Sequence, residues 1–203
     1  YGQTNPTFDA AVVGAVNGDM LAFTLASGAD QTSGAGSYPI VVTLGTNPNY
    51  DVTKHDGALM VVKAAASVTA NDKSKTYGQT NPTFDAAVVG TVNGDILAYT
   101  LASAADQTSG VGSYPIVVTL GVNPNYEVSK TDGTLTIGKA SASVTANDKS
   151  KTYGQTNPAL DAQVTGTVNG DTLAYNLATV ATQTSDVGNY PIVVTLGANA
   201  NYD

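Results

Sequence analysis

The chain contains no cysteine, tryptophan or arginine, and it has a single histidine and a single glutamate, Glu127. Without cysteine, disulfide bonds, thiolate metal sites and thiol nucleophiles are excluded. The 8 lysines stand against 16 acidic residues, for a net charge of −8. This balance argues against nucleic acid as a partner, because phosphates require clustered basic side chains. It also argues against docking on anionic membranes.

Long apolar runs are missing as well. The longest ones, such as "IVV" and "AAVV", are far shorter than the roughly 20 residues that a membrane helix needs. We therefore expect no membrane insertion in this segment. Apolar residues still make up 42% of the chain, which is a composition typical of a folded protein.

What the sequence has instead is a strict internal repeat. The hexapeptide "YGQTNP" begins at Tyr1, Tyr77 and Tyr153, so the period is 76 residues both times. The first two units differ at 14 of 76 positions, and the third copy covers 51 residues up to Asp203. Duplication of this kind multiplies length or valency more readily than it builds one active site. The period therefore predicts a linear array of modules.

A hydrophobic period of two predicts strands within each unit. In the segment 160–166 the alternation puts Leu160, Ala162 and Val164 on one face. The segment "GSYPIVVTL" at 112–120 is rich in β-branched residues and predicts another strand. Its inner residues are expected to be Ile116, Val118 and Leu120. Pro115 near its start implies an edge strand or the first strand position.

Turn signals separate these strands. Asp132-Gly133 lies between two short alternating runs and predicts a hairpin. "ASVTAND" predicts a strand and "NDKSK" a polar turn after it. "YGQTNP" reads as a turn, with Gly78 giving backbone freedom and Asn81-Pro82 an extended step. After Asp171 a strand competes with a short helix, because Leu173 and Leu177 are four apart and Asp is a good N-cap. We favour the strand.

Several motifs together carry a resemblance. The series "KTYGQTNPTFDAAVVGTVNGD", "GVGSYPIVVTL", "NPNYEV" and "GTLTIGKA" resembles the MBG domain of the YGX type, a repeat of large bacterial cell-surface and adhesin proteins. The resemblance covers the whole chain in three copies and implies no catalytic residues. It implies a β-grasp relationship, which favours a helix after Asp95. The period-two alternation favours an all-β sandwich instead.

The fold class we predict is therefore mainly β, with tandem modules, either immunoglobulin-like sandwiches or β-grasp-like, in an elongated rod. We place the first repeat at residues 1–64, without its opening strand, the complete second repeat at 65–140, and the third at 141–203, without its C-terminal hairpin. This frame leaves strand edges open at both ends. We expect either a longer protein around this segment or a strand from an adjacent copy at each open edge.

Residues for catalysis are hard to assemble. The lone histidine, His55, is replaced by Thr131 in the second unit, so no repeated mechanism can depend on it, and "KHDG" reads as a solvated hairpin tip. The residue types present do not allow a site that combines a nucleophile, a base and a group that stabilises the transition state. We predict that the protein is not an enzyme, with no catalytic, cofactor-binding or metal residues assigned.

Carboxylates are more numerous but scattered. They lie singly in predicted turns, as in Asn93-Gly94-Asp95, where we expect side chains to bond local backbone. Asn71-Asp72 and Asn147-Asp148 lie near the module junctions, where Ca²⁺ is the one cofactor we considered; the prediction is that no cofactor is bound.

The sequence also allows predictions for the lysine and tyrosine side chains. An isopeptide bond needs a buried acid beside a Lys–Asn pair, and Lys139 is the candidate donor. Otherwise we interpret all lysines as solvated residues that oppose edge aggregation. The tyrosines Tyr99, Tyr114 and Tyr126 are read as core and corner residues rather than as a glycan platform.

The function we expect is structural: a stalk or filament segment of a bacterial extracellular, adhesin-like surface protein that supplies length and stiffness. The alternative is a multivalent module that binds a glycan or protein weakly many times over. Expected partners are neighbouring repeats or copies of the same chain, with a host or matrix surface under the alternative. The expected location is the bacterial cell surface.

Overall fold

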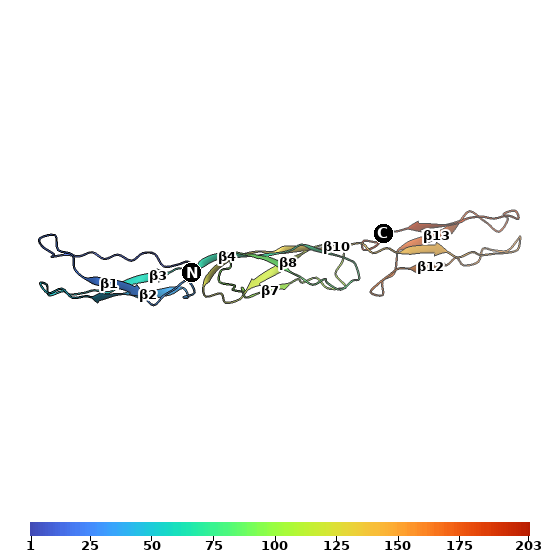
Figure 1. Ribbon diagram of the computed structural model, residues 1–203. Coiled ribbons are helices and arrows are strands. Elements are labelled where there is room, and N and C mark those ends of the chain that lie inside the picture. The colour runs from blue at the N-terminus through green and yellow to red at the C-terminus, as the bar shows by residue number, and fades with distance from the viewer. The chain divides into compact units, whose positions relative to one another are not determined.

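The computed structural model describes residues 1–203 and consists of fourteen strands with no helix (Figure 1). The first repeat contains β1 (Phe23–Ser27), β2 (Gly36–Leu44) and β3 (Gly57–Val61). The second contains β4 (Ala64–Ala70), β5 (Lys73–Thr76), β6 (Ala86–Val89), β7 (Tyr99–Ala102), β8 (Gly112–Leu120), β9 (Tyr126–Thr131) and β10 (Gly133–Gly138). The third contains β11 (Ser143–Ala146), β12 (Ala162–Thr165), β13 (Tyr175–Thr179) and β14 (Ile192–Leu196).

These residues form two compact units. The first unit comprises residues 1–69, 86–100 and 118–131, and the second comprises 70–85, 101–117 and 132–203. The division passes through the second repeat. Each unit therefore contains one complete junction between two consecutive repeats.

The first repeat is an antiparallel sheet in the order β1-β2-β3 (Figure 1). Strand β2 changes partner along its length: residues 36–40 pair with β3, and residues 40–44 pair with β1. Pro39 lies opposite Ala58 in the part that pairs with β3 alone. A proline is tolerated there because the other side of the strand has no ladder that needs its N–H.

The equivalent proline of the second repeat corrects an expectation. Pro115 pairs with Thr134 of β10, and β8 lies inside its sheet, in the order β5-β10-β8-β7. Both alternatives predicted for Pro115 are therefore wrong, since β8 is not an edge strand and begins at Gly112. The predicted face of β8 is right, because Ile116 and Val118 are fully buried while Thr119 is exposed.

Two parallel pairings define the second repeat. In the first unit, β4 pairs with β9 from Ala64 opposite Tyr126 to Thr69 opposite Thr131, within the sheet β6-β4-β9. In the second unit, β10 runs parallel to β5 and antiparallel to β8. Leu135 and Ile137 of β10 are the core of this sheet, at 0% and 1% exposure.

The predicted hairpin at Asp132-Gly133 is wrong. The strands on either side of it, β9 and β10, belong to different sheets, so the dipeptide is a corner between sheets. A side chain at Gly133 would place its Cβ 2.8 Å from the carbonyl oxygen of Ala70. Glycine is needed here for close backbone approach. The polar turn predicted at "NDKSK", residues 71–75, is wrong in its second half, because Lys73–Thr76 form strand β5.

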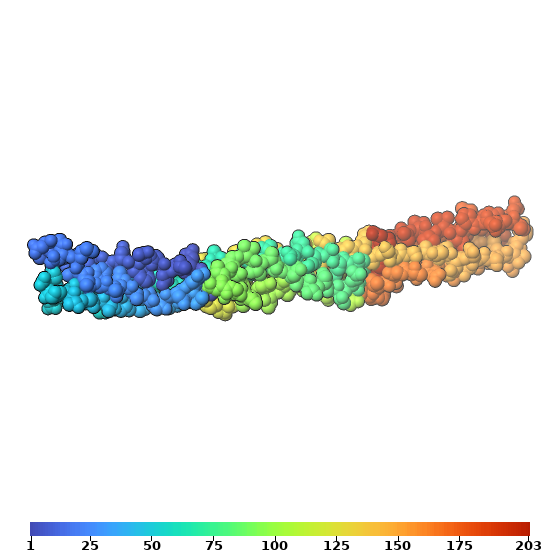
Figure 2. Space-filling view, in the orientation of Figure 1, coloured from blue at the N-terminus to red at the C-terminus, as the bar shows by residue number.

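The third repeat has the pairs β11-β12 and β13-β14, and its early residues lie beside its late ones (orange and red in Figure 2). Ala162 and Val164 are half-buried and Gln163 is exposed, which confirms the predicted face. The chain after Asp171 leads into β13, and the chain after Asp95 leads into β7. The helix alternative is therefore wrong at both places, including the one that a β-grasp relationship favours.

Candidate functional site at the repeat junctions

A tyrosine from one repeat meets a tyrosine and an aspartate of the next. In the first unit the hydroxyls of Tyr1 and Tyr126 both donate to Oδ2 of Asp95, each at 2.7 Å. The two rings meet edge to face, with centroids 5.6 Å apart and planes at 83°. We call this group of two tyrosines and one aspartate the tyrosine clasp.

The local sequence explains how Asp95 is presented. Asn93 and Gly94 both have positive φ, 57° and 79°, and the Asp95 N–H donates to the Val92 carbonyl at 3.0 Å. An Asn-Gly pair suits two consecutive left-handed residues. The Tyr126 hydroxyl also accepts from the Val92 N–H at 3.0 Å. The turn and the ring therefore fix each other's position.

The second unit contains the same clasp 76 residues later. Tyr77 and Tyr202 donate to Oδ2 of Asp171, each at 2.8 Å, with ring centroids 5.6 Å apart and planes at 85°. Both rings are buried. The same three residue types thus make the same contacts at both junctions.

The glycine that follows the clasp tyrosine is required for two reasons: its positive φ and its close contact with the next repeat. Gly78 has φ of +84°, and an added Cβ would lie 2.4 Å from Cγ2 of Val168 in the next repeat. Gly2 makes the equivalent approach to Val92. The predicted backbone freedom at Gly78 is confirmed, whereas its contact with the following repeat was not predicted.

An asparagine also forms hydrogen bonds across each junction. Asn125 Oδ1 accepts from the N–H of Ala35 at 3.0 Å, and its backbone carbonyl accepts from the N–H of Ala64 at 2.9 Å. Asn201 makes the equivalent bonds to Val111 and Ala140 in the second unit. In the second and third repeats the "NPNY"-type segment therefore reaches the preceding repeat through its asparagine, and its tyrosine enters the clasp.

Hydrogen bonding sets the charge state of the clasp. The hydroxyl of Tyr1, followed by that of Tyr126, lowers the pKa of Asp95 below its ordinary value. Burial raises the pKa of Tyr126, and the charge of Asp95 adds to this effect. A neutral phenol donating to an ionised carboxylate is the stable arrangement at neutral pH. The clasp is thus a structural anchor in which two phenol hydroxyls donate to the same carboxylate oxygen.

The three repeats match a known repeat family. The sequence model of the MBG domain, YGX type, matches residues 1–60, 66–136 and 142–203. The chain belongs to the MBG family. No curated protein and no solved structure matches it. The chain has no helix of the length and apolarity that crossing a membrane requires.

Three of the four asparagine and aspartate residues near the MBG junctions, Asn71, Asp72 and Asn147, bond to the protein itself. Asn71 donates to Asp85 at 2.9 Å, and Lys73 forms an ion pair with the same oxygen at 2.8 Å. Asp72 accepts from the N–H of Thr134 at 2.7 Å. No group of three or more His, Cys, Asp or Glu side chains converges as metal ligands. Calcium binding at Asn71-Asp72 or Asn147-Asp148 has no set of converging carboxylates to support it.

Other sequence candidates fall on the surface. His55 is exposed in an irregular stretch before β3 rather than at a hairpin tip. Lys139, the candidate isopeptide donor, forms an exposed ion pair with Asp203 at 3.3 Å. Asp106 bonds Thr108 and Ser109 within its own loop, as predicted for turn acids. Asp95 does not follow that prediction, because its carboxylate serves two distant tyrosines.

The prediction that all lysines are solvated is wrong for Lys75. This residue is 8% exposed, and its Nζ donates to the backbone carbonyls of Gln79 and Asp106. Lys151 makes the same two contacts in the third repeat, to Gln155 and Thr182. The ammonium therefore joins the "YGQTNP" turn to a second loop.

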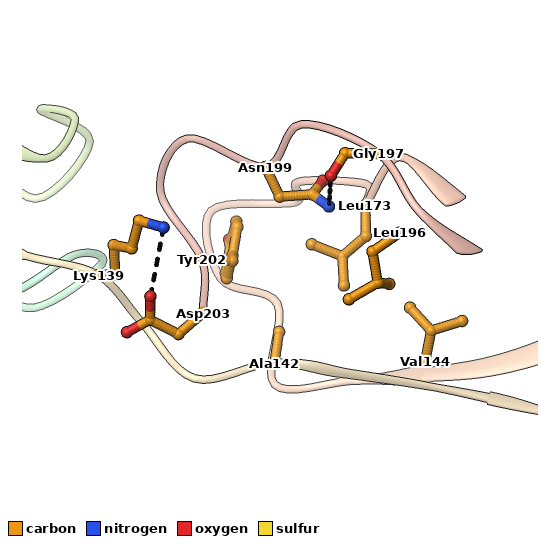
Figure 3. Close-up of a pocket in the computed structure, with 9 residues that line it drawn as sticks. All are labelled: Lys139, Ala142, Val144, Leu173, Leu196, Gly197, Asn199, Tyr202 and Asp203. Carbon is orange, nitrogen blue, oxygen red and sulfur yellow. Dashed lines mark hydrogen bonds and ion pairs between the residues drawn. The ribbon is translucent and has the colours of Figure 1, made fainter. Parts of the chain in front are cut away.

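A cavity of about 170 Å³ opens at the start of the third repeat (Figure 3). Its lining includes Val144 and Leu173. The side chains 76 residues earlier, Val68 and Leu97, are buried core residues of the second repeat. The cavity therefore corresponds to a less completely filled part of that core. Its polar lining residues are engaged elsewhere, since Lys139 pairs with Asp203 and Tyr202 belongs to the clasp.

Proposed function

We propose that this MBG array is a structural stalk segment of a bacterial extracellular, adhesin-like surface protein, without catalytic activity. The observation that carries the proposal is the recurrence of the tyrosine clasp with the same partners at both junctions. Identical junctions give each added repeat the same step and orientation. Stalk length then scales with repeat number.

Two features support stiffness as the property supplied, and a third supports separation of neighbouring stalks. Only Val62 and Lys63 separate β3 from β4 at the first junction. The backbone nitrogen of Tyr1 donates to the Val62 carbonyl within this link, as the Tyr77 N–H does to Gly138, and the clasp joins Tyr1 to Asp95 beyond it. The net charge of −8 keeps neighbouring acidic stalks apart in solution.

Small-angle X-ray scattering tests the proposal on the intact chain. We expect a radius of gyration well above the ~17 Å of a compact 203-residue globule. The double variant Asp95→Ala and Asp171→Ala should make the particle more flexible, because both clasps lose their shared acceptor. The control is Asp30→Ala, since Asp30 bonds Thr32 and Ser33 within its own loop.

Two results would contradict the stalk proposal. One is a compact radius of gyration for the unmodified chain. The other is specific binding of the chain to a glycan array or to matrix proteins, which favours the multivalent adhesion alternative. A stalk segment binds neither.

A further inference from the structure

The first two strands of the second repeat pair in parallel with its last two. In the first unit, β4 pairs with β9 over six residue positions, beginning with Ala64 opposite Tyr126. In the second unit, β5 pairs with β10 over four positions, ending with Thr76 opposite Gly138. Both pairings join the beginning of the repeat to its end. We call β4–β9 and β5–β10 the shear pairs.

Tension along the chain acts on the shear pairs in one direction. The chain enters the repeat at the amino end of β4, directly after Val62 and Lys63, and leaves it at the carboxyl end of β10. A pull on the chain at these two places draws the partners of each pair in opposite directions along their length. Because the strands are parallel, the bonds of each ladder are loaded together and not one after another.

Further backbone hydrogen bonds extend both ladders at the ends that meet the load. The Ala64 N–H donates to the carbonyl of Asn125, the residue before β9, at 2.9 Å. The N–H of Tyr77, the residue after β5, donates to the Gly138 carbonyl at 2.8 Å. The ladders therefore have no loose end at the points where the chain enters and leaves the repeat.

Both shear pairs are also held from within their sheets. Strand β4 lies between β6 and β9, and β10 lies between β5 and β8. Val68 of β4 is fully buried, as are Leu135 and Ile137 of β10. Ladder bonds beside buried side chains are costly to break, because water does not readily replace the lost partner.

The third repeat begins the same pairing. Ala140 and Tyr202 lie 76 residues after Ala64 and Tyr126, and they too form a parallel bridge. The Asp203 N–H donates to the Ala140 carbonyl at 3.0 Å. The parallel arrangement is therefore a property of the repeat and not of one copy.

We propose that the shear pairs make each complete MBG repeat a force-bearing element that resists tension along the chain. A repeat loaded in this way yields in a single step, when a whole ladder slides. The inference rests on the stalk proposal for its purpose, since tension reaches a segment that connects other parts of a surface protein. It adds a separate property, because a segment that is long and stiff at rest can still unravel under a weak pull.

Single-molecule force spectroscopy on the intact chain tests this inference. The chain has no cysteine, so two introduced cysteines give defined attachment points. Val62→Cys with Lys139→Cys loads the shear pairs along their length. Val62→Cys with Val122→Cys pulls the amino ends of β4 and β9 apart and opens their ladder from one end. All three positions are exposed and lie outside the strands.

The two pulling geometries should differ in unfolding force. At equal pulling speed we expect the force between positions 62 and 139 to be at least about twofold higher than between 62 and 122, because the ladder bonds share the load only in the first geometry. The high-force event should be a single step that releases the chain between the handles, at about 3.6 Å per residue.

Two results would overturn the force-bearing role. One is an equal unfolding force in the two geometries. The other is unfolding between positions 62 and 139 in several steps at low force. Neither result bears on the stalk proposal, which fails instead on a compact radius of gyration or on specific binding.

Discussion

At the scale of single residues, Asp95 shows how a turn residue gains a long-range role. The Asn-Gly-Asp sequence predicts its own turn correctly, because two left-handed residues need Asn and Gly. Its carboxylate partners could not be predicted, since Tyr1 is 94 residues away and belongs to the preceding repeat. The shared 76-residue period of the three motifs was the available signal, but a period does not say which repeats touch.

The pH dependence of the clasp follows from the direction of the Asp95 shift. Its pKa is lowered in the folded chain, so its stabilising contribution is complete above the ordinary aspartate value of about 4. That contribution is lost as the pH falls through the lower folded value. We expect Asp95→Ala to lower the midpoint of thermal unfolding at pH 7 and to lower it progressively less towards pH 3. A difference that stays constant over this range would contradict the clasp's charge state.

Gly133 gives a residue-scale test of the corner between β9 and β10. Gly133→Ala should destabilise the chain by about 1–3 kcal/mol, because the new Cβ would meet the Ala70 carbonyl oxygen at 2.8 Å. The control is Gly138→Ala, at the end of the same strand, where the nearest atom is 3.9 Å away. Urea unfolding measures both. Equal effects would mean that the glycine acts through chain entropy and not through close approach.

At the scale of elements, alternation predicted where strands lie and failed to predict how they pair. The faces of 112–120 and 162–165 are as expected, since burial on one side forces a period of two. The pairings β4 with β9 and β5 with β10 are parallel and join residues more than 55 positions apart. The local Asp132-Gly133 signal favours a hairpin of β9 and β10. In this fold each of these strands pairs instead with a strand far away in the sequence.

The burial of Lys75 also depends on a distant pairing that the local sequence does not reveal. A lysine in a polar stretch predicts a solvated side chain, because exposed ammonium groups are the rule. Here the stretch is strand β5, and β10, from a distant part of the sequence, pairs alongside it. The buried ammonium is compensated by two backbone carbonyls, which the sequence alone does not place.

Strand β8 provides the element-scale test. Val118→Asp should destabilise the second repeat by several kcal/mol, because it buries an unpaired carboxylate at a fully buried position. Val117→Asp, one residue earlier on the more exposed face, should change stability by about 0.5 kcal/mol or less. Circular dichroism during urea unfolding compares the two. Equal losses would show that the two faces of β8 are buried alike.

At the scale of the whole molecule, the 76-residue period and the pairing of strands are out of phase. Counted from the tyrosine, the first 76-residue period, residues 1–76, ends with the residues of β4 and β5. Strand β4 pairs with β6 and β9, and β5 pairs with β10, all of which come later in the chain. The hexapeptide that makes the repeat visible is thus an internal turn of the paired strands.

This phase difference predicts how fragments should behave. Residues 65–140 contain nearly all of β4 together with every strand that pairs with it, so this fragment should unfold in one cooperative transition. Residues 1–76 contain β4 and β5 without any of their partners, so amides 65–76 should exchange at nearly the rate of an unfolded chain. Hydrogen exchange and thermal unfolding of the two fragments measure this. Cooperative unfolding of 1–76 with protected amides at 65–76, beside a disordered 65–140, would mean that the folding unit begins at the tyrosine and that β4 and β5 find other partners.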